Sequence, residues 1–247
     1  MAPTLTRGFY ALQHHVQRMF LPTMPKIYSH PRSGTHLMRA FLAENFYPSA
    51  QLALHDPGRV WGHWADRQVF DEPVPNGLIP ASHYFPSQNP RDRIRPTIYI
   101  YRDGRAVALS LWKSIHFMNP TWQGISFADF LRRPIDWEAS PGFRVEPHET
   151  LAAHWARHVL AWHEAPYKSC CFIRYEQLVG DPAQVLEALC NSFGFLQRPE
   201  HTTAIRAKVG IVPNKSQVDS WKDAFTDEDE RFFRKEIGPE AESYLWV

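Results

Sequence analysis

Residues 26–38 read Lys-Ile-Tyr-Ser-His-Pro-Arg-Ser-Gly-Thr-His-Leu-Met, and this stretch decides the fold. A short apolar run reaches Pro31, turns through Ser-Gly-Thr and continues into a helix-like segment that begins at Thr35. A strand, a tight loop and a helix N-terminus in this order present unpaired backbone N–H groups and the positive end of a helix dipole. Gly34 lets the backbone approach an anion, and Arg32 adds a permanent charge. The stretch therefore predicts a phosphate or sulfate site at the turn.

The length of residues 1–247 predicts one large domain or at most two, and because 44% of the residues are hydrophobic, a sizeable core can be buried. A net charge of +1 argues against a nucleic-acid partner, which would favour a basic surplus. No Asp or Glu precedes Glu44, so the end that carries the candidate anion loop is the basic one. No apolar stretch is long enough to span a bilayer, and we predict no membrane partner.

Neither the cysteines nor the histidines form a metal motif. Cys170, Cys171 and Cys190 lack metal-ligand spacing, and their odd number favours reduced thiols and a cytoplasmic location. His154 and His158 are four residues apart, but no neighbouring Glu or third ligand accompanies them. The sequence therefore predicts no metal site.

Some segments lack regular periodicity. The acid-free residues 1–24 have apolar side chains at helical spacing, which favours an N-terminal helical extension over an organelle presequence. Residues 48–76 and 118–148 are rich in proline and tryptophan and have no sustained pattern. Such long segments are either binding regions, here for an acceptor, or surface connections whose aromatic residues complete the core. Both interpretations stay open.

The rest of the chain alternates strands with helices. Strand-like runs occupy residues 96–101 and 170–175, both apolar enough for buried strands. Helical patterns cover 149–163 and 183–193, the latter ending before a glycine. Strands that alternate with helices indicate an α/β fold with a mostly parallel central sheet flanked by helices.

The loop Pro31-Arg32-Ser33-Gly34-Thr35 resembles the 5′-phosphosulfate loop of PAPS-dependent sulfotransferases. Arg102, at the end of the central strand, and Ser110, eight residues later, resemble the 3′-phosphate motif of the same family. The resemblance implies a single domain of the P-loop type that binds PAPS and releases PAP. It assigns the 5′ end of the donor to a set of consecutive residues: Arg32, Ser33, Gly34, Thr35, His36 and Leu37.

Further landmarks follow in the family's order. His83 has the place of the catalytic base, although Ala81 replaces the lysine of that motif. The run from Trp155 to Trp162 resembles the family's Trp-x-x-His-Val-x-x-Trp helix. Tyr175 has the place of an aromatic residue that stacks on adenine. Lys215 lies in a phosphate clamp that departs from the family pattern, with Asn214, Ser216 and Asp219 in place of an arginine and two glycines.

The expected activity is in-line transfer of a sulfuryl group from PAPS to a hydroxyl or amine of a small molecule. His83 would take the acceptor's proton, and Arg32 would counter the charge on the bridging oxygen by electrostatics alone, because arginine keeps its proton. A non-catalytic PAP-binding protein, suggested by the altered clamp, is one alternative. A P-loop kinase is the other, although the chain lacks the Gly-Lys-Ser/Thr signature. Acceptor identity, O- or N-sulfation and oligomeric state stay open.

Overall fold

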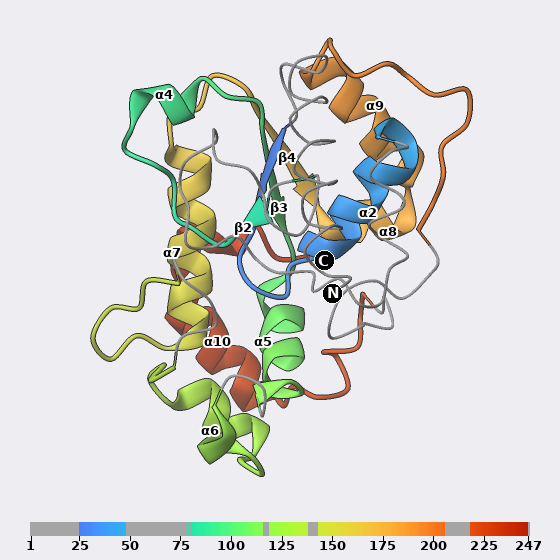
Figure 1. Cartoon of the computed structure of the whole chain (residues 1–247). Coiled ribbons are helices and arrows are strands. Elements are labelled where there is room, and N and C mark those ends of the chain that lie inside the picture. Colours follow the sequence, from blue (N-terminus) through green and yellow to red (C-terminus); the bar gives the residue numbers. More distant parts are fainter. Residues whose placement is uncertain are drawn as a thin grey trace, which may run out of the picture.

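The structure is a computed structural model that describes residues 25–47, 79, 81–115, 119–137, 143–205 and 218–246. Its centre is a four-stranded parallel sheet in the order β2-β1-β3-β4 (Figure 1). The strands are β1 (Lys26–Tyr28), β2 (Ala81–Ser82), β3 (Thr97–Tyr101) and β4 (Cys170–Arg174). The predicted α/β fold with a mostly parallel sheet is therefore confirmed.

The sheet is the framework on which the site residues are placed. In β3 every residue is buried, and its neighbours β1 and β4 pair with it in register from Thr97 onward. Because all strands are parallel, their carboxyl ends lie at the same edge. Residues that follow β1, β2 and β3 therefore approach one another, as ligand-binding residues do in open α/β sheets.

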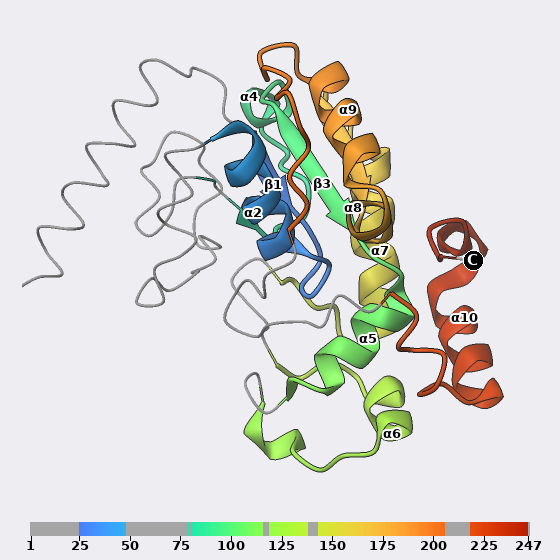
Figure 2. The same ribbon diagram turned by 90° about the vertical axis from the view of Figure 1, so that its right-hand side faces the viewer.

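Helices cover both faces of the sheet and its carboxyl edge. On one face lie α2 (Thr35–Phe46), α8 (Tyr175–Gly180) and α9 (Pro182–Ser192), and on the other lies α7 (Leu151–Glu164) (Figures 1 and 2). Beyond the carboxyl end of β3 lie α5 (Gly104–Trp112), α6 (Phe127–Arg132) and α10 (Asp227–Glu242) (Figure 2). The short elements α4 (Pro90–Arg93) and η2 (Pro120–Trp122) complete the described part.

Two hydrophobic cores correspond to these two layers. The first joins α2, α8 and α9 to one face of the sheet and contains Phe41, Ile98 and Leu189, each at most 1% exposed. The second joins α5, α6, α7 and α10 and is dominated by aromatic residues such as Trp155 and Phe233. The loop that follows β1 lies beside α2 and α5, where the two layers meet (Figure 2).

The structure corrects several sequence predictions. The segment predicted to lack pattern between 118 and 148 contains η2 and α6 in its described parts, and their N-caps are Asn119 and Ser126. Both helices are too short to produce a periodic apolar signal. The strand at 170–175 is not fully buried, because β4 is the edge strand and its residues alternate between buried and half-buried.

Helix boundaries also differ from the predicted ones by one or two residues. The helix predicted at 149–163 begins after the N-cap Thr150, whose hydroxyl accepts from Ala153 N. The helix predicted at 183–193 already begins at Pro182, next to its cap Asp181. The predicted N-terminal helix at 1–24 and the segment 48–76 lie outside the described residues. Within the described ranges, no helix has both the length and the apolar character needed to cross a lipid bilayer.

Candidate functional site

The loop between β1 and α2 is built to receive an anion. Arg32 and Gly34 both have positive φ angles, 66° and 98°, which turn the chain sharply into α2. Gly34 caps α2 without a side-chain hydrogen bond, and the first turn contains no acidic residue. The first intrahelical bond runs from Met38 N to Gly34 O. The preceding N–H groups of the first turn therefore lie at the positive helix end.

Two further observations at this loop fit an anionic ligand. The Ser33 hydroxyl is fully buried and has no hydrogen-bond partner within the described residues. It can therefore donate a hydrogen bond to an anion in the loop. A Cβ atom at Gly34 would lie 2.5 Å from Tyr175 Cδ2, closer than packing permits. Only glycine therefore lets the loop approach the ring of Tyr175 while keeping its left-handed turn.

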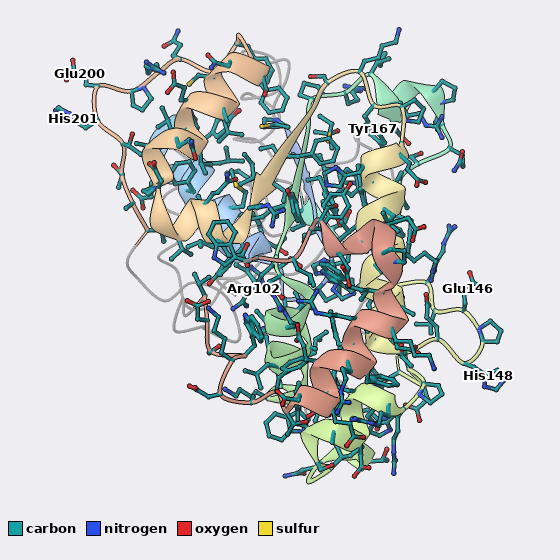
Figure 3. All side chains as sticks on the ribbon, turned by 180° about the vertical axis from the view of Figure 1, so that it is seen from behind. Arg102, Glu146, His148, Tyr167, Glu200 and His201 are labelled. Atoms are coloured by element: carbon teal, nitrogen blue, oxygen red, sulfur yellow. The ribbon has the colours of Figure 1, made fainter. Side chains whose placement is uncertain are left out.

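The second predicted phosphate motif meets the first. Arg102 follows β3, is 1% exposed and donates from Nη1 to the carbonyl of Arg32 at 3.4 Å. Ser110 lies on α5, and its Oγ accepts a 3.0 Å hydrogen bond from Arg32 Nε. Figure 3 shows Arg102 in the interior where β3 ends, whereas Glu146 and His148 lie on an outer loop. The structure thus joins Arg32, Arg102 and Ser110 in one hydrogen-bonded cluster.

The electrostatics of this cluster favour a polyanion. Burial lowers the pKa of Arg32, and the charge of Arg102 lowers it further. Burial also lowers the pKa of Arg102, whereas Tyr175, Glu176 and Asp103 oppose that shift. The Arg102 guanidinium lies 4.4 Å from the centre of the Tyr175 ring. These two neighbouring cations, Arg32 half-buried and Arg102 buried, repel each other, and a bound anion with several charges would remove that repulsion.

His83 lies directly after β2 and is 3% exposed. Its Nδ1 lies 2.7 Å from the carbonyl oxygen of Ser29. Since a carbonyl can only accept, Nδ1 carries the proton and the lone pair of the neutral imidazole is on Nε2. Burial lowers the pKa of His83 to about 4, the Ser29 carbonyl opposes this shift and the charge of Arg32 adds to it. The imidazole is therefore neutral at pH 7, as a base must be.

Helix α7 holds both halves of the site through side-chain N–H groups. Trp155 Nε1 donates to the carbonyl of Arg102 at 3.1 Å. His158 Nε2 donates to the carbonyl of His83 at 3.3 Å, and its Nδ1 lies 2.8 Å from the Tyr99 hydroxyl and accepts its proton. Trp162 Nε1 donates to the next carbonyl after His83 at 3.1 Å. This explains in physical terms why the predicted Trp-x-x-His-Val-x-x-Trp pattern lies on one helix.

The histidines at 154 and 158 both use their ring nitrogens for hydrogen bonds. His154 Nδ1 lies 3.0 Å from His30 Nε2, and His154 Nε2 lies 3.0 Å from the carbonyl of Arg144. No group of metal-ligating side chains is found in the described part of the chain. The predicted site residue Lys215 and its altered clamp lie outside the described residues.

A cavity of about 290 Å³ adjoins the loop helix, and the sequence did not predict it. Leu37, a predicted cofactor residue, lines it together with residues of α2, of α8, of the start of α9 and of the segment before residue 206: Phe41, Leu178, Val179, Gly180, Pro182, Ala204 and Ile205. Leu178 and Val179 follow closely after Tyr175, which the sequence did indicate as a candidate cofactor residue. Ala204 and Ile205 lie far along the chain in a stretch without pattern, so nothing in the sequence indicated them.

Comparisons with known proteins agree with this geometry. A family model described as "Sulfotransferase domain" matches residues 26–244. Among solved structures, the fold is similar to mouse sulfotransferase SULT7A1 complexed with PAP, with a TM-score of 0.54 and 18% sequence identity. That similarity covers 88% of this chain and 84% of the mouse chain. No curated protein sequence gives a significant match.

The family match covers both predicted phosphate motifs, the segment that bears His83 and helix α7. It thereby removes the kinase alternative that the sequence had left open. The chain belongs to the sulfotransferase domain family and is a PAPS-dependent sulfotransferase.

Proposed function

We propose that the chain transfers the sulfuryl group of PAPS to a hydroxyl or amine of a small-molecule acceptor, with His83 as general base. The observation that carries this proposal is the hydrogen-bonded cluster of Arg32, Arg102 and Ser110. PAPS, when bound, supplies the sulfuryl group and leaves as PAP when the acceptor atom displaces the phosphate oxygen at sulfur. The chain's own residues bind and orient PAPS and the acceptor, and they move the acceptor's proton.

The two ends of the donor would be held by different elements. The 5′-phosphosulfate fits the loop of Arg32, Ser33 and Gly34 with the first turn of α2, which carries Thr35, His36 and Leu37. The 3′-phosphate fits Arg102 and Ser110, and Lys215 would add a further cation. The loop offers backbone N–H groups and the buried Ser33 hydroxyl, while the arginines supply permanent charge.

The cavity beside Leu37 is the proposed place of the adenine ring. Its volume of about 290 Å³ exceeds that of a purine, and its lining combines apolar side chains with exposed polar groups, which suits a flat heteroaromatic ring that also forms hydrogen bonds. Tyr175 packs against Gly34 and under the Arg102 guanidinium. In this position the ring supports Arg102, and adenine stacking on Tyr175 stays a prediction.

His83 would accept the proton of the acceptor on Nε2 while its Nδ1–H stays on the Ser29 carbonyl. A base positioned in this way accelerates a reaction about 10²–10⁴-fold. Arg32 would stabilise the charge that grows on the leaving phosphate, without giving up a proton. Because arginines provide the positive charge, we expect no metal requirement and full activity in the presence of a chelator.

Two further parts of the proposal concern the surroundings of the site. Segments 48–76 and 118–148 are the proposed acceptor regions, and the described part of the second one contributes Trp122 and Trp137 to the aromatic core. Residues 1–24 are proposed to be an extension of the single domain. The free thiols of Cys170, Cys171 and Cys190 favour a reducing, cytoplasmic setting.

The experiment that tests the function is incubation of the protein with PAPS and a panel of phenols, alcohols and amines, followed by PAP release. The variant His83→Gln keeps an N–H group for the Ser29 carbonyl but has no base. We expect it to lose turnover about 10²–10⁴-fold while it binds PAP with wild-type affinity. Unchanged turnover would remove His83 from the mechanism. A chain that binds PAP but transfers to no member of the panel would contradict the proposed acceptor class.

A further inference from the structure

Ser29 lies directly after β1 and connects the base to the donor loop. Its Oγ lies 2.6 Å from Thr35 Oγ1 at the start of α2 and 3.2 Å from His83 Nδ1. Its carbonyl accepts the main hydrogen bond of His83 Nδ1 at 2.7 Å. Ser29 is fully buried, and Thr35 and His83 are 4% and 3% exposed. These contacts form an uninterrupted buried chain, Thr35–Ser29–His83, between two elements of the site.

The protons of this chain have a preferred direction. The Nδ1–H of His83 points to the carbonyl of Ser29, and Ser29 Oγ lies within reach of the same proton as a second acceptor. A hydroxyl that accepts from Nδ1 keeps its own proton for another partner, and Thr35 Oγ1 is the partner at 2.6 Å. The Thr35 hydroxyl then accepts from Ser29 and keeps its own proton for a different acceptor, such as a bound anion.

We propose that Ser29 is a positioning residue that couples the protonation of His83 to the hydrogen bond that Thr35 offers the donor. The inference rests on the proposed function, because it assigns Thr35 to the 5′ end of PAPS and the base to His83. Ser29 itself touches neither the donor nor the acceptor. It acts through the residues on both sides.

The coupling works in the direction of the reaction. The acceptor's proton goes to His83 Nε2, the new bond forms between the acceptor atom and sulfur, and the bond from sulfur to the phosphate oxygen breaks with its electron pair on that oxygen. The resulting imidazolium is a stronger donor at Nδ1, and this strengthens its bonds to Ser29. A more polarised Ser29 hydroxyl makes the Thr35 hydroxyl a stronger hydrogen-bond donor. In the proposed complex, Thr35 donates to the phosphate on which negative charge grows.

The charged and titratable neighbours of His83 do not provide this link. Arg32 opposes protonation of His83 through its charge. Further neighbours that interact electrostatically with the His83 ring are histidines of the β1–α2 loop, of α2 and of α7: His30, His36 and His158. The hydrogen bonds of His83 Nδ1, by contrast, lead to the carbonyl and the hydroxyl of Ser29.

The test uses Ser29→Ala, which removes the hydroxyl and keeps the carbonyl, together with Ser29→Thr, which restores a hydroxyl. Ser82→Ala is the matched control, because Ser82 is also fully buried at a strand end and its hydroxyl has no partner in the described part of the chain. Readouts are kcat, the PAP dissociation constant by calorimetry, and the downfield proton resonance of His83 Nδ1–H at pH 7. That resonance is identified by its loss in His83→Gln.

We expect Ser29→Ala to lower kcat about tenfold, the value of one hydrogen bond to a charged group, and to change the PAP dissociation constant less than about threefold. Addition of PAP should shift the His83 Nδ1–H resonance in the wild type and shift it by less than half as much in Ser29→Ala. Ser29→Thr should recover most of kcat and of the PAP-induced shift. Ser82→Ala should behave as the wild type.

The proposal is overturned if Ser29→Ala keeps wild-type kcat and the full PAP-induced shift. It is equally overturned if the variant loses PAP affinity by the same factor as kcat, since that marks a general structural defect. Failure of the proposed function gives a different result. Full turnover of His83→Gln would refute the role of His83 as base and would say nothing about Ser29. The resonance shift in Ser29→Ala then still decides whether PAP binding reaches His83 through Ser29.

Discussion

Arg32 Nε donates a 3.0 Å hydrogen bond to Ser110 Oγ, although these residues are 78 positions apart in the chain. The first belongs to the loop after β1 and the second to the helix after β3. Their contact joins the predicted 5′-phosphosulfate and 3′-phosphate sites directly. Because Ser110 keeps its own hydroxyl proton and Arg32 keeps four further N–H donors, both can contact phosphate oxygens while this hydrogen bond holds them together.

The charge of Arg32 should matter more than its shape. Arg32→Gln removes the charge, and we expect kcat to fall about 10²–10³-fold, as when one transition-state donor is removed. Arg32→Lys should keep substantial activity at pH 7 but lose it as the pH rises, because burial lowers a lysine pKa. Lys26 shows the effect in this chain, where burial lowers its pKa to about 8.

The measurement for Arg32 is the dependence of kcat on pH between pH 6 and 10. In the wild type, kcat should not fall through deprotonation of Arg32, since arginine stays protonated throughout this pH range. Identical alkaline profiles for wild type and Arg32→Lys would contradict a purely electrostatic role.

Gly34 should tolerate no side chain. A Cβ atom there would lie 2.5 Å from Tyr175 Cδ2, and its φ of 98° is strained for any other residue. Gly124 is a matched control, because its φ of 84° is similarly strained but a Cβ atom there would meet no described atom within 4 Å. We expect Gly124→Ala to cost about 1–2 kcal/mol of stability and Gly34→Ala to cost more. Urea unfolding measures both.

The same pair of glycine variants should separate in ligand binding. Gly34→Ala displaces the loop from Tyr175 and should weaken PAP binding at least about tenfold, whereas Gly124→Ala should leave it unchanged. Equal PAP affinities of the two variants would show that close approach at Gly34 is irrelevant to the site.

Helix α7 should affect the two halves of the site separately. His158→Phe removes the donor to the carbonyl of His83, so we expect a lower kcat with little change in PAP affinity. Trp155→Phe removes the donor to the carbonyl of Arg102, so PAP affinity should fall more than kcat. Each lost hydrogen bond corresponds to about 0.5–1.5 kcal/mol, or roughly a two- to tenfold effect. If both variants lower kcat and PAP affinity in parallel, α7 contributes general stability only.

Stability should decline in mild acid because histidines are buried in neutral form. Burial lowers the pKa of His30 to about 3 and that of His83 to about 4, from an ordinary 6.5. Below pH 6.5 these histidines therefore bind protons in the unfolded chain but stay neutral in the folded chain. This stabilisation is complete above pH 6.5 and is lost as the pH falls toward 4 and 3, by about 1.4 kcal/mol per pH unit for each histidine.

Urea midpoints at pH 7.5 and 5.5 measure this decline, and the midpoint at pH 5.5 should be clearly lower. Equal midpoints would mean that these histidines are protonated in the folded chain as readily as in the unfolded one.

The sequence predicted the framework because its signals are local. The apolar run at 97–101, the Gly34 turn and the 3.6-residue period of α7 each follow from a few neighbouring residues. Arg102 was placed by its position after a strand, and His83 by the order of family landmarks along the chain. The contacts that complete the site are not local. Nothing in the sequence shows that Arg32 reaches Ser110, that Ser29 holds His83, or that Ala204 shares a cavity with Leu37, because these pairings depend on tertiary packing.

The account stands on the claim that one pocket holds both phosphate groups of the donor. The most direct measurement compares PAP with 5′-AMP, which lacks the 3′-phosphate, by calorimetry on wild type and on Arg102→Gln. Arg198→Gln serves as a control, since the Arg198 side chain is 60% exposed. In wild type and the control, PAP should bind about 10–100-fold more tightly than 5′-AMP. In Arg102→Gln this preference should fall close to one, and an undiminished preference in that variant would contradict the account.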